Sequence, residues 1–265
     1  MKEYIRHNRD AWNKKVSVHY TSDFYANDNF MAGESSLKEI ELSLLGDIKE
    51  KKVLHLQCHF GQDTISLSRK GATVTGVDFS EEAIKLARNL ARELTVSTKF
   101  ICSDVYELPN VLDEKFDIVF TTYGTIGWLP DIDRWAKLVS SYLKPGGNLV
   151  FAEFHPVVWM FDDNFKKITY AYFKQEPIVE TEVGTYADRQ AGIEQKTITW
   201  NHSLSEVMQS LIDQGLSIDI FREYDYSPYN CFNGTIEYQP GKFRIASLAD
   251  KIPMVYAIKA RQVRT

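Results

Sequence analysis

The segment 53–78, VLHLQCHFGQDTISLSRKGATVTGVD, constrains the fold of this chain more than any other stretch. It contains a short apolar run, a loop that ends in Gly61, a helix-length segment and a second apolar run that ends in Asp78. Short apolar runs that end at turn residues indicate buried strands. Two strands joined by a helix pair in parallel through a right-handed crossover. The segment therefore predicts an open α/β sheet, which binds its ligand beyond the carboxyl ends of the strands.

The alternation of strands and helices continues to residue 155. Further strands are predicted at 98–102, 116–122 and 148–154, and helices at 63–70, 80–94 and 131–143. The helix ends carry their usual signals, because Ser80 can cap one helix and Gly71 follows the end of another. Residues 144–147, Lys-Pro-Gly-Gly, predict a tight turn. This order is typical of a doubly wound sheet.

Beyond residue 155 the sequence becomes aromatic and rich in β-favouring residues. Antiparallel strands are predicted at 167–173 and 177–186, a helix at 203–214, and strands at 216–224 and 252–260. Segments 156–200 and 225–250 are interpreted as insertions that cover one edge of the sheet. Residues 1–40 are interpreted as a partly helical cover of the same edge.

Composition narrows the classes of function. The chain of 265 residues has a formal net charge of −5 and no long run of Lys or Arg, which disfavours nucleic acid as a partner. The N-terminus has no signal-peptide pattern, and no apolar run has the length of about 20 residues that a membrane span needs. Cys58, Cys102 and Cys231 form no CxxC pair, which indicates reduced thiols rather than a disulfide framework or a zinc site. We expect a soluble cytoplasmic protein without a metal.

Polar residues follow four of the predicted strands, where a ligand would bind. The loop 57–63 brings its backbone and the free N–H groups of a helix start to the ligand. Asp78 can accept both hydroxyls of a ribose, and the segment 103–105 can contact an adenine edge. The segment 121–124 can line the reactive end of a cofactor. Two acidic residues after successive strands, beside a loop that ends in glycine, favour a cofactor that contains adenosine.

The motifs at these positions resemble those of class I S-adenosylmethionine-dependent methyltransferases that modify small molecules. The resemblance runs from about Val53 to Pro156, and its motifs are VLHLQCHFG, GVDFS, SDVYELP, FDIVFTT and LKPGGNLVFAEFHP. It implies a Rossmann-like, mostly parallel sheet of seven strands, with an antiparallel last strand, IPMVYAIKA, and a β insertion after the fifth strand. It also implies methyl transfer from S-adenosylmethionine to a small-molecule acceptor.

The resemblance also implies how the chain is divided into segments and which residues form the site. The expected segments are an N-terminal helical cover (1–45), an S-adenosylmethionine-binding core (46–155), a β-rich lid (156–200) and the C-terminal part of the core sheet (201–265). The implied cofactor-binding residues are Gln57, His59, Gly61, Asp63, Asp78, Phe79, Ser80, Asp104, Val105 and Thr122. A base assists transfer to a hydroxyl or a protonated amine, and the candidates are His155 and, less favoured, His59 and Tyr123.

The first motif departs from the family pattern, which is acidic-x-Gly-x-Gly-x-Gly. This chain has His55, Gln57 and His59 at the first three marked positions and keeps only Gly61. Asp63 can supply the missing carboxylate, or it only caps the helix. Gln57 and His59 would narrow the space for the methionyl group or hydrogen-bond with it.

Two other functions use the same sheet. An NAD-dependent oxidoreductase would also place a carboxylate on the ribose, but the chain has no GxGxxG loop and no Tyr-x-x-x-Lys pair after a later strand. The glycine-poor loop also fits a binding or regulatory protein that has a methyltransferase fold with weak or no activity. The methyl acceptor and the oligomeric state cannot be predicted from the sequence.

Overall fold

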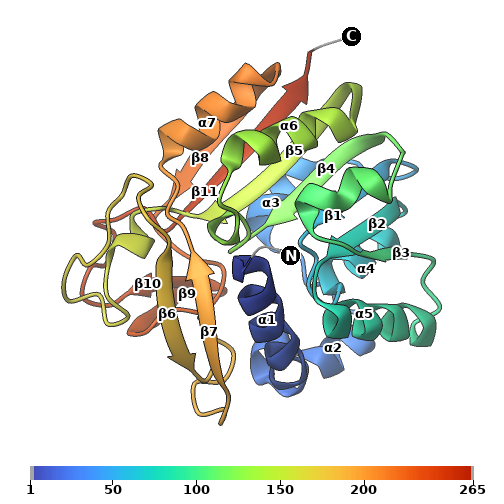
Figure 1. Cartoon of the computed structure of the whole chain (residues 1–265). Helices are drawn as coiled ribbons and strands as arrows, with labels where there is room; N and C mark the ends of the chain where they lie inside the picture. Colours follow the sequence, from blue (N-terminus) through green and yellow to red (C-terminus); the bar gives the residue numbers. More distant parts are fainter. Residues whose placement is uncertain (1–2, 264–265) are drawn as a thin grey trace.

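A seven-stranded sheet forms the centre of the computed structural model, which describes residues 3–263 (Figure 1). The strands lie in the order β3-β2-β1-β4-β5-β11-β8. Their bounds are β1 (Lys52–Leu56), β2 (Thr73–Asp78), β3 (Lys99–Cys102), β4 (Phe116–Thr122), β5 (Leu143–Phe154), β8 (Leu216–Tyr224) and β11 (Val255–Gln262). The first five pair in parallel, and β11 runs antiparallel to both of its neighbours, β5 and β8. The predicted fold class, including the antiparallel last strand, is confirmed.

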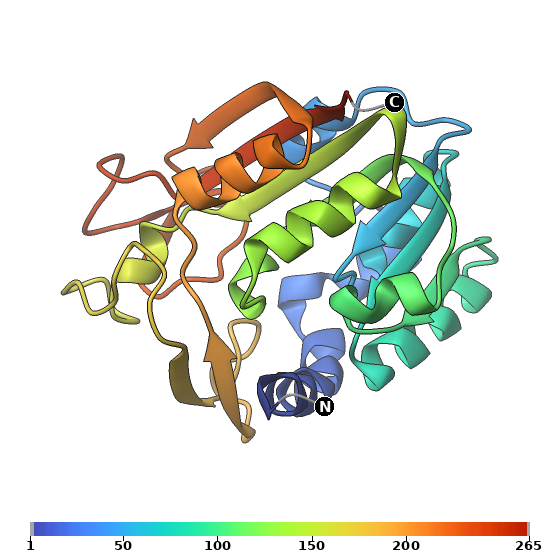
Figure 2. The same cartoon turned by 45° about the horizontal axis from the view of Figure 1, so that its top comes forward.

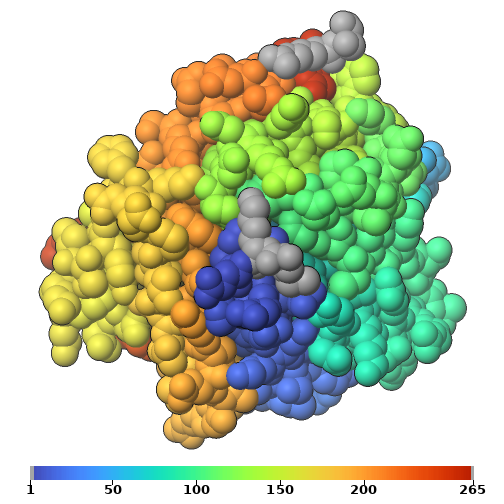
Figure 3. Space-filling view, in the orientation of Figure 1, coloured from blue at the N-terminus to red at the C-terminus, as the bar shows by residue number. Residues whose placement is uncertain are grey.

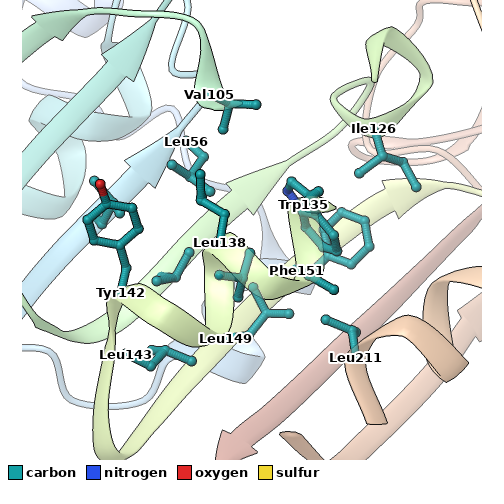
Figure 4. Packing of buried hydrophobic residues seen from close by; sticks show 14 of the residues in the cluster. Leu56, Val105, Ile126, Trp135, Leu138, Tyr142, Leu143, Leu149, Phe151 and Leu211 are labelled. Atoms are coloured by element: carbon teal, nitrogen blue, oxygen red, sulfur yellow. The ribbon is translucent and has the colours of Figure 1, made fainter. Parts of the chain in front are cut away.

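Helices cover both faces of this sheet (Figures 1 and 2). α3 (Glu39–Leu45), α4 (Gln62–Arg69) and α5 (Glu81–Glu93) pack on one face, and α6 (Ile132–Tyr142) and α7 (Leu204–Asp213) pack on the other. Figure 4 shows the core under α6, where Trp135 lies against Phe151 of β5. Because the strand order reverses between β1 and β4, the ligand crevice of such a sheet lies at their carboxyl ends.

Short polar side chains begin the long helices. The Ser80 hydroxyl accepts the Ala83 N–H at 3.1 Å, which confirms Ser80 as the N-cap of α5. Asp131 and Ser203 cap α6 and α7 in the same way.

The predicted tight turn at 144–147 is wrong as a separate element, because β5 begins at Leu143. Phe116 pairs with Leu143 and Ile118 with Asn148, so the four residues form an irregularity within the pairing of β4 and β5. A Cβ at Gly147 would lie 3.0–3.1 Å from three carbonyl oxygens, which explains why a glycine stands there.

The segment after β5 differs from its prediction. Residues 167–173 are not a strand, because Ile168 makes only an isolated bridge and Tyr170 donates its N–H to the Met160 carbonyl. The antiparallel pair consists of β6 (Ile178–Val183), as predicted within 177–186, and β7 (Glu194–Thr199), which the sequence reading missed. A second hairpin, β9 (Thr235–Gln239) with β10 (Lys242–Ile245), lies within the segment 225–250 that was interpreted as an insertion. Its signal was the Pro240-Gly241 turn between two short runs.

The N-terminal segment lies above the carboxyl ends of the strands rather than along an edge strand. It consists of α1 (Glu3–Thr21), a short 3₁₀ turn η1 (Asp23–Tyr25) and α2 (Asn27–Met31). α1 packs between β7 and α5, and in Figure 3 it fills the surface between the orange lid and the teal core. Residues 1, 2, 264 and 265, at the ends of the predicted segments 1–45 and 201–265, lie outside the described residues. Between residues 3 and 263 no helix has the length and apolar character needed to cross a membrane.

Candidate active site

A cavity of about 850 Å³ lies where the strand ends meet the N-terminal segment and the lid. Its floor comes from the loops after β1, β4 and β5, and its opposite wall comes from α1, the β6–β7 pair and residues 229–233. Aromatic side chains from both sides line it, including Trp12, Trp128, Trp159, Trp200 and Tyr229. The volume is within the usual range for small-molecule sites, about 300–1,000 Å³.

The loop after β1 adopts left-handed conformations that favour glycine, although two of its three such residues are not glycines. Gln57, His59 and Gly61 all have positive φ, at 54°, 49° and 84°. These are the three positions at which the family pattern has glycine. Only Gly61 has no room for a side chain, since a Cβ there would lie 2.7 Å from the Phe100 ring. At positions 57 and 59 the backbone therefore adopts a conformation that favours glycine although both residues carry side chains.

Those side chains have polar atoms without partners. The Gln57 amide donates to the Thr125 carbonyl at 2.8 Å, and its Oε1 is buried with no partner among the described residues. His59 Nε2 lies 3.0 Å from His19 Nδ1 of α1, and His59 Nδ1 is also unpartnered within residues 3–263. Burial lowers the pKa of His59 to about 3 and that of His19 to about 2, so both rings are neutral.

Asp78 lies at the end of β2 beside this loop. Its Oδ2 accepts the His59 N–H at 2.8 Å and its Oδ1 accepts the Ser80 N–H at 2.9 Å. Burial raises the pKa of Asp78 to about 6, against the effect of these bonds. Each oxygen retains a lone pair, so the carboxylate can still accept hydroxyl groups.

A second cavity, of about 30 Å³, adjoins Asp78. Phe79, Asp104 and Val105 line it from the core, and Tyr4 and Asn8 of α1 close it from outside. Asp104 also caps the turn η2 (Val105–Asn110) by accepting the Tyr106 N–H at 2.8 Å. The residues predicted to bind adenosine are therefore together, but α1 occupies the space over them.

Asp63 extends from the first turn of α4 into the large cavity. Its Oδ1 accepts the Ser36 hydroxyl at 2.5 Å and its Oδ2 accepts the Thr122 hydroxyl at 3.4 Å. Burial raises the pKa of Asp63, and no Lys or Arg of the described chain lies within ion-pair distance of it. His55, at the acidic position of the pattern, bonds to Thr64 at 2.8 Å, and burial lowers its pKa to about 3. Asp63, and not residue 55, therefore provides a carboxyl group on the cavity in addition to that of Asp78.

The two candidate bases lie in different places. Tyr123 follows β4, lines the large cavity and donates its hydroxyl to Glu41 at 2.8 Å. His155 is outside the cavity lining: its Nδ1 accepts the Val157 N–H at 3.1 Å and its Nε2 lies 3.0 Å from Glu223. Since both ring nitrogens of His155 are engaged, it has no free atom for an acceptor.

The structure brings most of the predicted residues together. Those on the large cavity are Gln57, His59, Gly61, Asp63, Asp78, Phe79, Thr122 and Tyr123. Asp104 and Val105 line only the small cavity, and Ser80 and His155 line neither. The sequence reading missed Glu41, a carboxyl with 0% exposure on the buried side of α3, next to Ile40 and near Leu44. A charged residue among the apolar positions of a short helix was the signal that could have identified it.

Comparisons with known proteins agree with this arrangement. Residues 53–147 match the family model described as "Methyltransferase domain". A ubiquinone biosynthesis O-methyltransferase of Coxiella burnetii is 35% identical over 116 residues, which cover 44% of this chain and 48% of that protein. The uncharacterized methyltransferase YbaJ of Bacillus subtilis is 24% identical over 84% of this chain and 91% of its own length.

A solved structure extends the likeness beyond the matched domain. The structure described as a putative S-adenosylmethionine-dependent methyltransferase from Listeria monocytogenes superposes with a TM-score of 0.57. It is 19% identical and covers 84% of this chain and 95% of its own, which shows the fold alone. The chain spans about half the length of the ubiquinone O-methyltransferases that it matches. The predicted resemblance to class I methyltransferases is confirmed for the fold and for the core domain.

Proposed function

We propose that this chain, whose residues 53–147 match a methyltransferase domain, transfers a methyl group from S-adenosylmethionine to a small-molecule acceptor. The observation that carries the proposal is the loop after β1, which is left-handed at positions 57, 59 and 61, the three positions at which the family pattern has glycine. It opens onto a large cavity that also contains Asp63 and Asp78. A cytoplasmic location and the division of the chain after residues 45, 155 and 200 are parts of the same proposal.

The residues at the methionyl end fit this cofactor. Asp63 is a carboxylate in need of a cation, and Gln57 Oε1 is a buried acceptor in need of a donor. The methionyl ammonium is both a cation and a hydrogen-bond donor. Asp63 therefore takes the role of the acidic residue that the family pattern has at the position of His55. Asp78 would hold the ribose hydroxyls, and Phe79, Asp104 and Val105 would surround the adenine. The bound cofactor supplies a methyl group that its sulfonium has already activated.

The adenine end fits only after a movement of α1. A cavity of about 30 Å³ holds a water or two and no purine ring. Tyr4 and Asn8 line this cavity from α1, opposite Asp104 and Val105 of the core. We therefore infer that α1 moves outward to admit the cofactor and returns over it.

The remaining part of the large cavity suits a planar, largely apolar acceptor. Trp128, Trp159 and Trp200 provide flat apolar walls, and the β6–β7 pair closes the side opposite the sheet. Transfer from a sulfonium depends mainly on holding the nucleophile in line with the methyl carbon, and walls on two sides of a cavity help to do this. A base at Tyr123 would assist an acceptor that must lose a proton.

A second candidate is a protein that binds the cofactor without transferring its methyl group. The position of His59 favours it, because the ring stands beside Trp12 and His19 within the space of the glycine loop. The two candidates agree on cofactor binding and differ only in turnover.

Thermal unfolding with S-adenosylhomocysteine, followed by a methyl-transfer assay, tests both candidates. At a ligand concentration of about 100 times Kd the folded state gains roughly 2.7 kcal/mol, which raises Tm by about 5–10 °C in a chain of this size. Asp63→Asn should lose most of that shift, since it removes the charge beside the ammonium, whereas Asp162→Asn, at another carboxyl on the cavity, should keep it. No shift at millimolar ligand would contradict the proposal. A shift without transfer from labelled S-adenosylmethionine to a panel of phenols and amines would favour the binding protein.

A further inference from the structure

Glu41 is a buried carboxyl without a counter-charge. It belongs to α3, has 0% exposure and accepts hydrogen bonds from the Tyr123 hydroxyl and from the backbone N–H of Lys38. No Lys or Arg side chain of residues 3–263 forms an ion pair with it. A charge at such a site is costly to the stability of a fold, so burial favours the neutral carboxyl group of Glu41.

A structural role explains only one of these bonds. The Lys38 N–H is a free donor at the start of α3, and Glu41 satisfies it as the second half of a capping box. A glutamine would make the same bond without a buried charge. The capping box also does not involve Tyr123, which comes from the other side of the site.

Tyr123 links this carboxyl to the cavity. Its ring lines the cavity, whereas Glu41 does not, so the Tyr123 hydroxyl is the group that stands between them. The ring is held between Phe154, at 5.7 Å, and Tyr229, at 5.2 Å. The backbone of Tyr123 has a φ of 46°, an uncommon conformation for a non-glycine residue and one that often marks a functional position.

We propose that Glu41 receives the proton that the methyl acceptor loses, and that Tyr123 passes it on. This inference rests on the proposed methyl transfer. The lone pair of the acceptor oxygen or nitrogen forms the new bond to the methyl carbon while the carbon–sulfur bond breaks and its electron pair stays on sulfur. The acceptor proton moves to the Tyr123 oxygen, and the Tyr123 proton moves to Glu41 Oε2. The products are the methylated acceptor, S-adenosylhomocysteine and a neutral Glu41.

The relay defines a class of acceptor. Its nucleophile carries a proton, as a phenol hydroxyl or a primary or secondary amine does. A tertiary amine or a thioether has no proton to lose and makes no use of Glu41.

Charged and titratable groups around Glu41 set the pH at which the relay works. Asp63 of α4, Tyr123 and Tyr229 approach it from the cavity side, Lys38 precedes α3, and Lys259 of β11 bonds to the Leu44 carbonyl on the same helix. Burial, and then the charge of Asp63, raises the pKa of Glu41 to about 8. Glu41 is therefore mostly protonated at neutral pH. The fraction of Glu41 that is ionised, and can accept a proton, increases as the pH rises toward 8.

Transfer rates for Glu41→Gln and Tyr123→Phe test the relay. The probe is the best acceptor found for the wild-type protein among simple phenols and primary arylamines, assayed from pH 6 to 9. In the wild-type protein kcat should rise about tenfold per pH unit and level off near pH 8. Both variants should lose about a hundredfold in kcat, the usual contribution of a general base, and should lose the pH dependence. Glu41→Asp should recover part of the rate with a shifted profile.

Two controls separate the relay from a loss of cofactor binding and from a general loss of activity. S-adenosylhomocysteine should bind Glu41→Gln within a few-fold of the wild-type affinity, and transfer to pyridine, which loses no proton, should not depend on Glu41. If Glu41→Gln does not fold, Tyr123→Phe alone decides the question. A wild-type protein that methylates no probe overturns the proposed function and the relay with it. Wild-type transfer together with an unchanged rate and pH profile in both variants overturns the relay alone.

Discussion

At the scale of single residues, the loop after β1 shows that a left-handed conformation does not require glycine. Gln57 and His59 adopt left-handed conformations that cost a non-glycine residue about 1–2 kcal/mol each. The surrounding chain holds them there, because the His59 N–H is fixed by Asp78 and the Gln57 amide by Thr125. The sequence showed that the glycines were absent but not that the conformation persisted, since φ depends on these contacts with distant strands.

Two substitutions at His59 test whether residue 59 has a left-handed conformation. His59→Ala and His59→Gly both remove the ring and its contacts with Trp12 and His19, so both should destabilise the protein. Only glycine relieves the positive φ, and His59→Gly should therefore be the more stable of the two by about 1 kcal/mol. Urea unfolding measures the difference. An alanine variant as stable as the glycine variant would show that residue 59 is not left-handed.

At the scale of elements, local patterns predicted the core and failed for the lid. Strands such as β4 and helices such as α5 carry clear periodicity and end signals, and they were predicted to within a few residues. The aromatic and β-favouring residues of 167–173 predicted a strand, but this segment lies against Met160 and Asn201 instead of a strand partner. β7 was missed because five of its six residues are polar, and two of these polar side chains, Gln195 and Thr197, face Glu182 and the interior.

α1 has the character of a cover that can move. Three of its five buried residues are polar, and its contacts with the lid include hydrogen bonds and an ion pair beside the ring contacts of Tyr4 and His19. Asn8 exchanges two bonds with the backbone of Ile198 in β7, at 2.7 and 2.8 Å, and Lys15 pairs with Glu182 at 3.0 Å. Interfaces of this polarity resemble those between domains that move relative to each other.

Loosening α1 should therefore speed the exchange of cofactor. In Asn8→Ala both bonds to β7 are lost, so S-adenosylhomocysteine should associate and dissociate several-fold faster than in the wild-type protein. Stopped-flow tryptophan fluorescence can follow this, because Trp12 and Trp128 line the cavity. Gln209→Ala, which removes an exposed bond within α7, is the matched control and should leave both rates unchanged. Equal rates in Asn8→Ala and the control would mean that α1 does not limit entry.

At the scale of the whole molecule, the part of the chain that stabilises the fold differs from the part that covers the site. The sheet with α3 to α7 contains the three apolar clusters, whereas α1 contributes none of the residues that make up their buried cores. The sheet could be predicted from the sequence because a short apolar run indicates a buried strand wherever its partners lie. It could not predict the closed adenosine end, since that depends on how Tyr4 and Asn8 meet residues about 100 positions away in the chain.

Amide hydrogen exchange should show this division directly. Local opening follows the number of buried apolar contacts, so the amides of β4 and β5 should exchange only through global unfolding. The amides of α1 should exchange much faster, through a local opening that detaches the helix from β7 and α5. S-adenosylhomocysteine should slow exchange in α1 by more than it slows exchange in the sheet, because the helix closes over the ligand. Equal protection of α1 and β4 without ligand would show that α1 is an integral part of the core, and the cofactor would then need another route to Asp78.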